Sequence, residues 1–268
     1  MSKISEVSKT LYVPLGGRIY ASEYFPDLFY DAKAIELKNR IPQDILNYKL
    51  QSQYTFLASV SRCITIDNII NSFLEQNPTG NIIELGCGLE TTYFRVDNGL
   101  AKWFELDLPE VIELREQLIP CQERMTFLKE SVFDLGWMER LSSELDKQPI
   151  LFVASGLFQY FAETMIIELL LDLKRFQNSY IVFDAVSKAG MKRTRKYMKK
   201  LGRESASMYF YCDQALDLVE KLGGSSELIF EKNFFQGINK KGMNLVTKIS
   251  MLVSDMFQML KIIELKLS

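Results

Sequence analysis

The sequence predicts an α/β fold in which a parallel sheet is built from alternating strands and helices. Strand-like apolar runs recur from Asn81 onward, and stretches with helical patterning lie between them. The first run ends in the turn Gly86-Cys87-Gly88, which is typical of α/β folds that bind nucleosides. Successive units of this kind are right-handed, so their strands are expected to pair in parallel.

The first 78 residues are expected to form a helical cap that precedes the sheet. Prolines and glycines interrupt residues 1–28, so this stretch is expected to be irregular. Helical patterning follows it, with a break at Pro42. The helical runs are expected at about 31–41, 43–60 and 67–75.

Residues 79–268 are expected to form one compact core. The all-apolar run Ile150–Ala154 suits a central strand that is buried on both faces. The five core strands are expected at Asn81–Leu85, Ala101–Leu106, Met125–Lys129, Ile150–Ala154 and Tyr180–Asp184. The helices between them are expected at Leu108–Leu118, Trp137–Leu145 and Glu163–Phe176. The chain should end in a strand, a helix and a strand at Glu227–Phe234, Gly242–Leu260 and Lys261–Leu267.

An insertion of about 188–212 follows the fifth strand. It contains a basic run, Lys188–Arg203, which fits either a solvated helix face or a basic lid over an anionic substrate. Its aromatic cluster, residues 208–211, fits either a wall for a planar substrate or packing of the insertion itself.

Composition excludes several classes of protein. The 268 residues carry a net charge of −2, from 32 basic and 34 acidic side chains, so the basic excess that non-specific nucleic-acid binding needs is missing. No apolar run approaches the roughly 18 residues that span a membrane, and we expect a cytoplasmic protein without a membrane partner. The 4 cysteines form no CxxC pair, so reduced thiols are expected instead of disulfides or a zinc site.

The sequence contains no histidine. Serine–histidine and cysteine–histidine nucleophilic catalysis are therefore excluded, and so are metal sites with histidine ligands. Any acid or base must be an aspartate, glutamate, lysine, tyrosine or cysteine. No metal is expected.

The glycine turn favours a cofactor without phosphates. Gly86 and Asp107 lie 21 residues apart, close to the roughly 20 that separate a glycine turn from a ribose-binding acid. The third glycine of a dinucleotide fold is replaced by Thr91, and Glu90 before it would repel a pyrophosphate. S-adenosylmethionine has no phosphate, and its ammonium and sulfonium groups suit Glu84. A nicotinamide oxidoreductase is the less favoured alternative.

Five segments between about Leu57 and Asp184 carry a family resemblance. They are Leu85–Thr91, Phe94–Gly99, Trp103–Val111, Ser131–Asp134 with Trp137, and Gly156–Phe161. In this order they resemble the leucine carboxyl methyltransferase family, in particular its bacterial polyketide O-methyltransferases of tetracenomycin type. The resemblance implies a doubly wound, seven-stranded, Rossmann-like class I methyltransferase sheet whose last strand lies antiparallel beside the fifth. It also implies S-adenosylmethionine as cofactor and S-adenosylhomocysteine as product.

The resemblance implies roles for individual residues in holding the cofactor. Arg62 would pair with the methionine carboxylate, unless it is a surface arginine, and Asp107 would accept from the ribose diol. Asp134 with Leu135 would form the adenine site. The alternative role of Asp134 is that of a helix N-cap before Trp137. The implied cofactor-binding residues are Arg62, Glu84, Gly86, Gly88, Asp107, Leu108, Phe133, Asp134, Leu135 and Ser155.

One position departs from the family. The family usually has a glutamate before Gly156, and this chain has Ser155. The side chain is shorter and uncharged, although its hydroxyl can still form hydrogen bonds. We expect this change to alter either the affinity for the cofactor or the inherited substrate.

The acceptor is expected to be a small molecule, and its binding residues are open. Tyr160 is the candidate catalytic residue, and the alternative is that its ring packs in the core. The reaction itself is expected to be accelerated mainly by proximity. Tyr160, Tyr209 and Tyr211 are the candidate pocket residues, and the aromatic residues of the N-terminal region can be interpreted in the same way. A carboxylate is ionised at neutral pH, whereas a phenol of pKa near 10 usually needs a base, so the lack of histidine favours a carboxylate acceptor.

Three functions remain in view. The first is an S-adenosylmethionine-dependent O-methyltransferase that modifies a small molecule, such as an aromatic or polyketide acid of secondary metabolism. The second is a carboxyl methyltransferase that acts on the C-terminal leucine of a protein. The third is a regulatory protein that binds S-adenosylmethionine without catalysis, which Ser155 keeps open. The oligomeric state is left open by the sequence.

Overall fold

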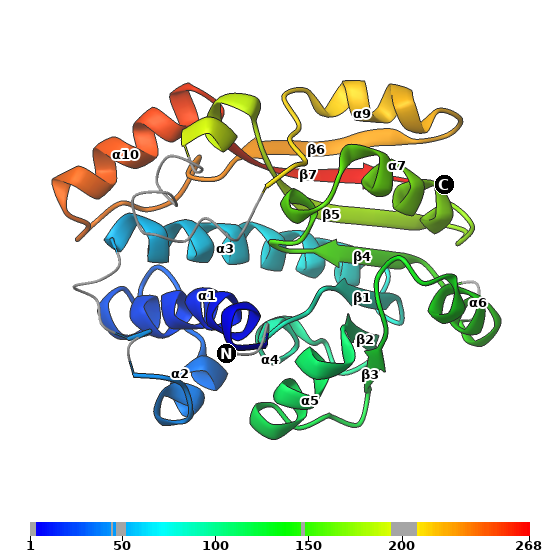
Figure 1. Cartoon of the computed structure of the whole chain (residues 1–268), viewed down its shortest axis with the longest axis horizontal. Coiled ribbons are helices and arrows are strands. Elements are labelled where there is room, and N and C mark those ends of the chain that lie inside the picture. Colours follow the sequence, from blue (N-terminus) through cyan, green and yellow to red (C-terminus); the bar gives the residue numbers. More distant parts are fainter. Residues whose placement is uncertain (1–3, 44, 47–51, 146–147, 194–207) are drawn as a thin grey trace.

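The computed structural model describes residues 4–43, 45–46, 52–145, 148–193 and 208–268. Within these residues the strands form a seven-stranded sheet of order β3-β2-β1-β4-β5-β7-β6, which Figure 1 shows with helices packed around it. The strands are β1 (Asn81–Leu85), β2 (Lys102–Asp107), β3 (Met125–Lys129), β4 (Ile150–Ala154), β5 (Ser179–Val186), β6 (Glu227–Asn233) and β7 (Leu260–Lys266).

Strands β1 to β5 are parallel, and β7 runs antiparallel between β5 and β6. Both the parallel core and the antiparallel last strand were predicted, and the predicted strand ends agree with the structure to within two residues. The sheet is the class I methyltransferase sheet. Strand order reverses between β1 and β4, which is where α/β sheets bind ligands beyond the carboxyl ends of their strands.

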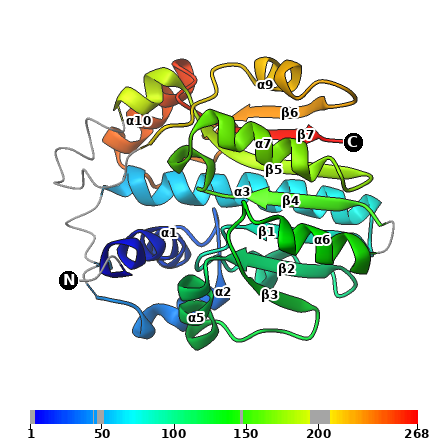
Figure 2. The same cartoon turned by 45° about the vertical axis from the view of Figure 1, so that its right-hand side comes forward.

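Both faces of the sheet are covered, since β1 and β4 are buried along their whole length and side chains of a strand point alternately to the two faces. Side chains on one face, such as Ile83 and Phe152, pack in one apolar cluster with α6, α7 and α9. Side chains on the other face, such as Ile82 and Leu151, pack in a second cluster with α3 and α4. Figure 2 shows α6 and α7 in front of the strands. These helices are α3 (Gln53–Gln76), α4 (Thr92–Val96), α6 (Leu135–Glu144), α7 (Glu163–Leu173) and α9 (Ala215–Leu222).

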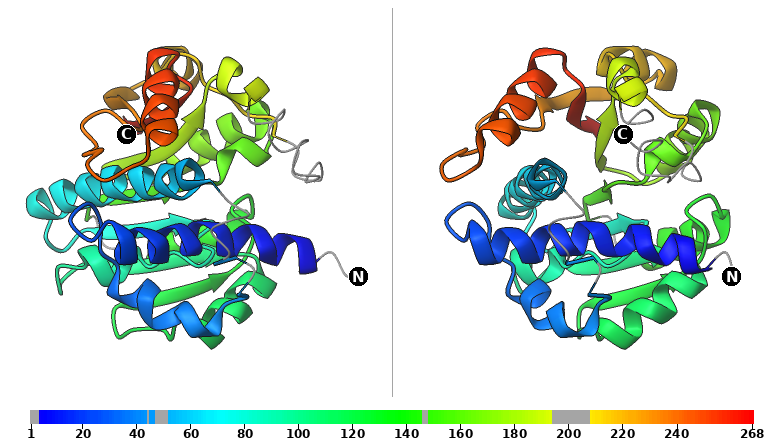
Figure 3. Two further views of the ribbon diagram at one scale, coloured as in Figure 1. Left: turned by 90° about the vertical axis from the view of Figure 1, so that its left-hand side faces the viewer. Right: turned by 60° about the vertical axis from the view of Figure 1, so that its left-hand side comes forward.

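The expectation of an irregular N-terminus was wrong. Residues Ile4–Tyr24 form the helix α1, although Pro14, Gly16 and Gly17 lie inside it. The glycines allow α1 to lie close to its neighbours: a Cβ on Gly17 would lie 2.5 Å from Oγ of Ser59 on α3. The packing of α1 against α3, visible in Figure 3, therefore outweighs the weak helix propensity of these residues.

The expectation that residues 43–60 and 67–75 form two separate helices was also wrong. One helix, α3, spans the 24 residues Gln53–Gln76. Its N-cap is Ser52, whose hydroxyl accepts from the Thr55 amide at 3.2 Å. Its central turns are buried all round, including Ser61, Arg62 and Cys63, so the sequence shows no amphipathic period there.

The remaining helices connect the strands. Residues 32–37 form α2 (Ala32–Leu37), followed by the 3-10 turn η1 (Lys38–Arg40), as the break before residue 43 predicted. α5 (Pro109–Leu118) follows β2, and the 3-10 turn η2 (Phe158–Tyr160) follows β4. α10 (Leu245–Met256) lies beside the start of α3 (Figure 1).

The expected insertion is described only in part. Residues 188–193 are helical, and residues 194–207 lie outside the described residues, with most of the basic run. Among the helices that the structure describes, none combines the length and the apolar character needed to cross a lipid bilayer.

Candidate functional site

The glycine turn lies at the carboxyl end of β1. Gly86 and Gly88 have φ of +66° and +48°, a conformation that other residues adopt only with strain. A Cβ on Gly86 would lie 2.7 Å from a methyl carbon of Leu157, in the turn after β4. Leu157 therefore packs on the backbone of this turn at a distance that only glycine at position 86 allows.

Asp107, the last residue of β2, holds the glycine turn in place. Its two carboxylate oxygens accept from the backbone amides of Gly88 and Leu108, each at 2.8 Å. Burial raises the pKa of Asp107, and these two amide donors oppose the rise. Each carboxylate oxygen still has a free lone pair, so the group can accept from the hydroxyls of a ribose as predicted.

A cavity of about 150 Å³ lies between α1, the glycine turn and the turn after β4. It brings together residues that lie far apart in the sequence. Among the residues that line it are Arg18, Arg62, Gly86, Gly88, Ser155 and Tyr160. Five of these six were predicted as site residues, and Arg18 was not, because α1 itself was not expected.

Arg62 is buried, so the interpretation of Arg62 as a surface arginine was wrong. It extends from α3 toward the cavity, and its Nη1 lies 3.3 Å from Oδ2 of Asp184 near the end of β5. The other oxygen of Asp184 accepts from the backbone amide of Gly156. A buried carboxylate therefore lies next to Ser155, at the point where the family's glutamate is missing. No sequence motif marked Asp184.

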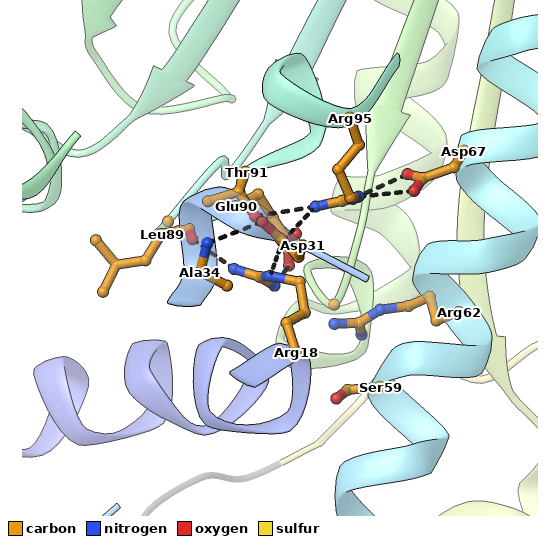
Figure 4. A network of polar contacts seen from close by, with 12 residues as sticks. Arg18, Asp31, Ala34, Ser59, Arg62, Asp67, Leu89, Glu90, Thr91 and Arg95 are labelled. Carbon is orange, nitrogen blue, oxygen red and sulfur yellow. Dashed lines mark hydrogen bonds and ion pairs between the residues drawn. The ribbon is translucent and has the colours of Figure 1, made fainter. Parts of the chain in front are cut away.

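Arg18 joins α1 to the glycine turn. Its Nη1 donates to Glu90 at 2.7 Å, its Nη2 donates to the Leu89 carbonyl at 2.6 Å, and its Nε lies 3.3 Å from Asp31. Figure 4 shows these contacts. Burial alone would raise the pKa of Glu90, but Arg18 and the neighbouring arginines outweigh burial and hold this pKa below its ordinary value. Glu90 is thus ionised and paired, which explains why a carboxylate is tolerated between the glycine turn and α4.

A second arginine extends the same network toward α3. Arg95 on α4 forms a bidentate pair with Asp67 at 2.7 and 2.9 Å, and its Nη1 donates to Asp31 at 3.0 Å (Figure 4). Asp31 also accepts from the Thr91 hydroxyl and caps α2 through the Ala34 amide. The helical cap is therefore tied to the sheet by buried ion pairs.

Glu84 lies beneath the glycine turn, outside the residues that line the cavity. It is 3% exposed and lies in register with Glu105 on β2, which pairs with Arg115. Burial, and then the charge of Glu105, raise the pKa of Glu84 to about 8. Arg115 also donates to the carbonyls of Gly88 and Glu90 at 3.0 and 2.7 Å, so this cluster supports the turn from below.

The predicted adenine pair, Asp134 and Leu135, and the predicted cofactor-binding residues Leu108 and Phe133 lie on the open edge just after strands β2 and β3. Leu108 and Leu135 are each 41% exposed, so their side chains are accessible to a ligand. Phe133 is half-buried, with its ring 4.7 Å from that of Phe161. Asp134 occupies the N-cap position of α6 without a capping bond, and instead accepts from the Ser131 amide at 3.2 Å. Their contact with adenine stays a prediction.

The three candidate tyrosines are separated. Tyr160 lines the cavity and is 41% exposed, and the surroundings of its hydroxyl raise its pKa, mainly through burial. Tyr209 is 57% exposed and Tyr211 40% exposed, and neither is among the residues that line the cavity. Tyr211 lies instead beneath the Lys188 ammonium, at 5.8 Å.

The site fits S-adenosylmethionine. Arg62 would supply a cation for the carboxylate, the glycine turn would lie beside the cofactor, and Asp107 would offer its free lone pairs to the ribose, as the resemblance implied. The cavity is smaller than the roughly 300–1,000 Å³ of most small-molecule sites. We therefore expect the methionine part to lie inside it and the adenosine part along the open edge.

Comparison with known proteins agrees with this geometry. The sequence model of the leucine carboxyl methyltransferase family matches residues 22–173. The tetracenomycin polyketide synthesis O-methyltransferase TcmP of Streptomyces glaucescens is 28% identical over 186 residues, which are 69% of this chain and 67% of that protein.

Solved structures show the same fold at low identity. A methyltransferase of Thermobifida fusca, itself described as putative, superposes with a TM-score of 0.58 and 14% identity, over 93% of both chains. The magnesium protoporphyrin IX methyltransferase of Synechocystis PCC 6803, solved with bound S-adenosylhomocysteine, superposes with a TM-score of 0.53 and 11% identity, over 94% of this chain and 100% of that one.

Proposed function

Because this chain belongs to the leucine carboxyl methyltransferase family and is an S-adenosylmethionine-dependent methyltransferase, we propose that it methylates an oxygen of a small-molecule acceptor. A carboxylate is the favoured acceptor and a phenol the alternative. The name of the relative TcmP supports an aromatic or polyketide acceptor.

The observation that carries the proposal is the lack of a suitable base among the described residues that line the cavity. Burial raises the pKa of Tyr160 and holds that of Cys87 well above its ordinary value, so both stay protonated at neutral pH. Glu90 has a lowered pKa and pairs with Arg18. A site of this kind suits an acceptor that is already ionised, as a carboxylate is at pH 7.

The residues then act mainly by position. The bound cofactor supplies a methyl group that its sulfonium already activates. Arg62 binds the methionine carboxylate, and Asp107 orients the ribose through the lone pairs that the backbone amides leave free. The protonated Tyr160 can donate a hydrogen bond at the mouth of the cavity. The rate enhancement then comes mainly from alignment of the acceptor oxygen with the methyl group, as in other reactions that proximity accelerates.

A transfer assay tests the proposal. The protein is incubated with S-adenosylmethionine labelled in the methyl group and with three acceptors: aromatic carboxylic acids, phenols of matched shape, and a peptide ending in leucine. We expect label on the acids, in a form that mild alkali releases as methanol, because methyl esters hydrolyse and aryl methyl ethers do not. Label only on the peptide, or only on nitrogen, would contradict a small-molecule O-methyltransferase.

One observation also supports the regulatory alternative. Arg62 is already paired with Asp184 through Nη1, and Ser155 replaces the family's glutamate, so the cofactor would share the guanidinium with a carboxylate. Tight binding of S-adenosylmethionine with no transfer to any acceptor, in the wild type and in Ser155→Glu, would favour regulation. Transfer that appears only in Ser155→Glu would show that this position alone removed catalysis.

A further inference from the structure

A second and larger cavity, of about 600 Å³, lies between the start of α3, the start of α10 and residues 190–193. Its volume is within the range of small-molecule sites. Apolar groups supplied by Ala58, Val246, Met259 and Leu260 line it, with amides and hydroxyls among them. None of the functions derived above uses this cavity.

The cavity begins one helical turn from the cofactor site. Ala58 lines the large cavity and Arg62 lines the cavity at the glycine turn, and these residues are neighbours on one side of α3. Tyr54, a further turn back, also lines the large cavity. The same helix thus contributes to both cavities, and a molecule in the large cavity would lie next to the cofactor's methionine end.

The walls of the cavity are fixed by specific contacts. Gln53 accepts from the Asn244 amide at 2.9 Å and donates to the Tyr20 hydroxyl at 3.1 Å, so it ties α10 and α1 to the start of α3. On the other side, a Cβ on Gly190 would lie 2.3 Å from the Met259 carbonyl oxygen. Residues 188–193 therefore pack against the start of β7 at a distance that only glycine allows.

One cation in this cavity has no acidic partner. Arg193 is exposed, and among the described residues its one hydrogen-bond contact is with Sδ of Met259 at 3.9 Å, with no carboxylate within ion-pair distance. Arg193 and Tyr54 line the same cavity. Burial raises the pKa of Tyr54, and a hydrogen bond with Ser254 and then the charge of Arg193 oppose the rise. Arg193 is thus available to an anionic group.

We propose that this cavity binds the methyl acceptor, and that the acceptor is an elongated apolar acid whose acidic group pairs with Arg193. The inference rests on the proposed function and names the substrate class. Along α3 the residues that line the two cavities run from Tyr54 to Arg62, eight positions that cover about 12 Å at 1.5 Å per residue. An acceptor of two or three fused rings extends along this length, with an anchoring carboxylate at Arg193 and the methyl-accepting oxygen, which in the proposed function belongs to a second carboxylate, at the other end.

A matched pair of probes tests the proposal. 6-Hydroxy-2-naphthoic acid and 2-naphthol share the ring system and the ring hydroxyl and differ in the carboxylate that Arg193 would bind, so the pair tests the anchor and not the transfer of the methyl group. Each is titrated calorimetrically into the protein saturated with S-adenosylhomocysteine. We expect the acid to bind at least about tenfold more tightly than the naphthol, as a charged hydrogen-bonded pair provides. Equal affinities, or no binding of either probe, would overturn the proposal.

Three variants locate the binding. Arg193→Gln should remove the advantage of the acid over the naphthol, whereas Lys192→Gln, which removes the neighbouring exposed cation, should keep it. Ala58→Phe should block both probes by filling the cavity. Arg193→Gln with an unchanged preference for the acid would overturn the assignment of the anchor, and unaltered binding by Ala58→Phe would overturn the cavity.

Titration of S-adenosylhomocysteine alone separates this inference from the proposed function. It also shows that each variant is folded, because the cofactor residues are unchanged in all three. Cofactor binding without a preference for the acid would overturn the acceptor site and leave the methyltransferase proposal intact. Probe binding without cofactor binding would contradict the proposed function and leave the anionic site standing.

Discussion

The Arg62 guanidinium and the Asp184 carboxylate form a buried ion pair, 3.3 Å between Nη1 and Oδ2, that joins α3 to β5 beside the cofactor site. Asp184 also accepts from the Gly156 amide, so one carboxylate fixes both the arginine and the turn after β4. The pair keeps the guanidinium in place before the cofactor arrives. A methionine carboxylate bound by Arg62, as we propose, would share the guanidinium with Asp184.

Arg62→Gln should weaken S-adenosylmethionine by about 10- to 100-fold, because a charged hydrogen bond to the methionine carboxylate is lost. Glutamine keeps a donor for Asp184, so the fold should persist. Adenosine, which lacks the carboxylate, should bind almost as well as to the wild type. Calorimetric titration with both ligands measures the difference, and equal losses would count against the assigned role.

Asp107→Ala should weaken S-adenosylmethionine by about 1–3 kcal/mol, because the ribose hydroxyls and the Gly88 amide lose their shared acceptor. Glu110→Ala is the matched control, since Glu110 is an exposed acid on the following helix. Affinities from the same titration decide the result. If Asp107→Ala bound S-adenosylmethionine as tightly as the wild type does, Asp107 would not be the residue that binds the ribose.

Arg18→Gln should lower the free energy of unfolding by about 3–5 kcal/mol, the cost of breaking a buried pair and leaving its acids without a partner. Lys38→Gln breaks an exposed pair with Glu23 and should cost about 1 kcal/mol or less. Urea denaturation measures both variants. Similar small losses would show that α1 is not held by this network.

Glu84→Gln should change how stability depends on pH. The pKa of Glu84 is about 8 in the folded protein against an ordinary value of 4.5. Between these values the folded state holds a proton that the unfolded state has released, so the wild type loses stability as pH rises from about 5 to 8. Glutamine cannot ionise, so the stability of the variant relative to the wild type should increase with pH over this range and stay constant at higher pH. Melting temperatures across pH measure this, and parallel curves would refute it.

The sheet could be predicted from the sequence because its strands are locally encoded. Runs such as Ile150–Ala154 are wholly apolar and end at clear turn residues, so their bounds follow from pattern alone. The glycine turn and Asp107 could be predicted because their spacing is fixed by the geometry of one β–α–β unit. The antiparallel place of β7 followed from family resemblance.

The cap could not be predicted in the same way. α1 forms because Gly16 and Gly17 allow it to pack against its neighbours, and this tertiary contact is invisible in local propensity. Arg18 meets Glu90 and Asp31 only after the cap folds onto the sheet, so no spacing in the sequence marks that network. The large cavity beside α10 has the same origin, since its walls come from three distant segments.

The most direct test of the account is calorimetric titration of the purified protein with S-adenosylmethionine, S-adenosylhomocysteine and NAD. The account predicts micromolar binding of the first two, carried by Arg62 and Asp107, and no binding of NAD, because the Glu90 carboxylate that lines the cavity would disfavour a pyrophosphate. Binding of NAD, or failure of both methyl-donor ligands to bind, would contradict it.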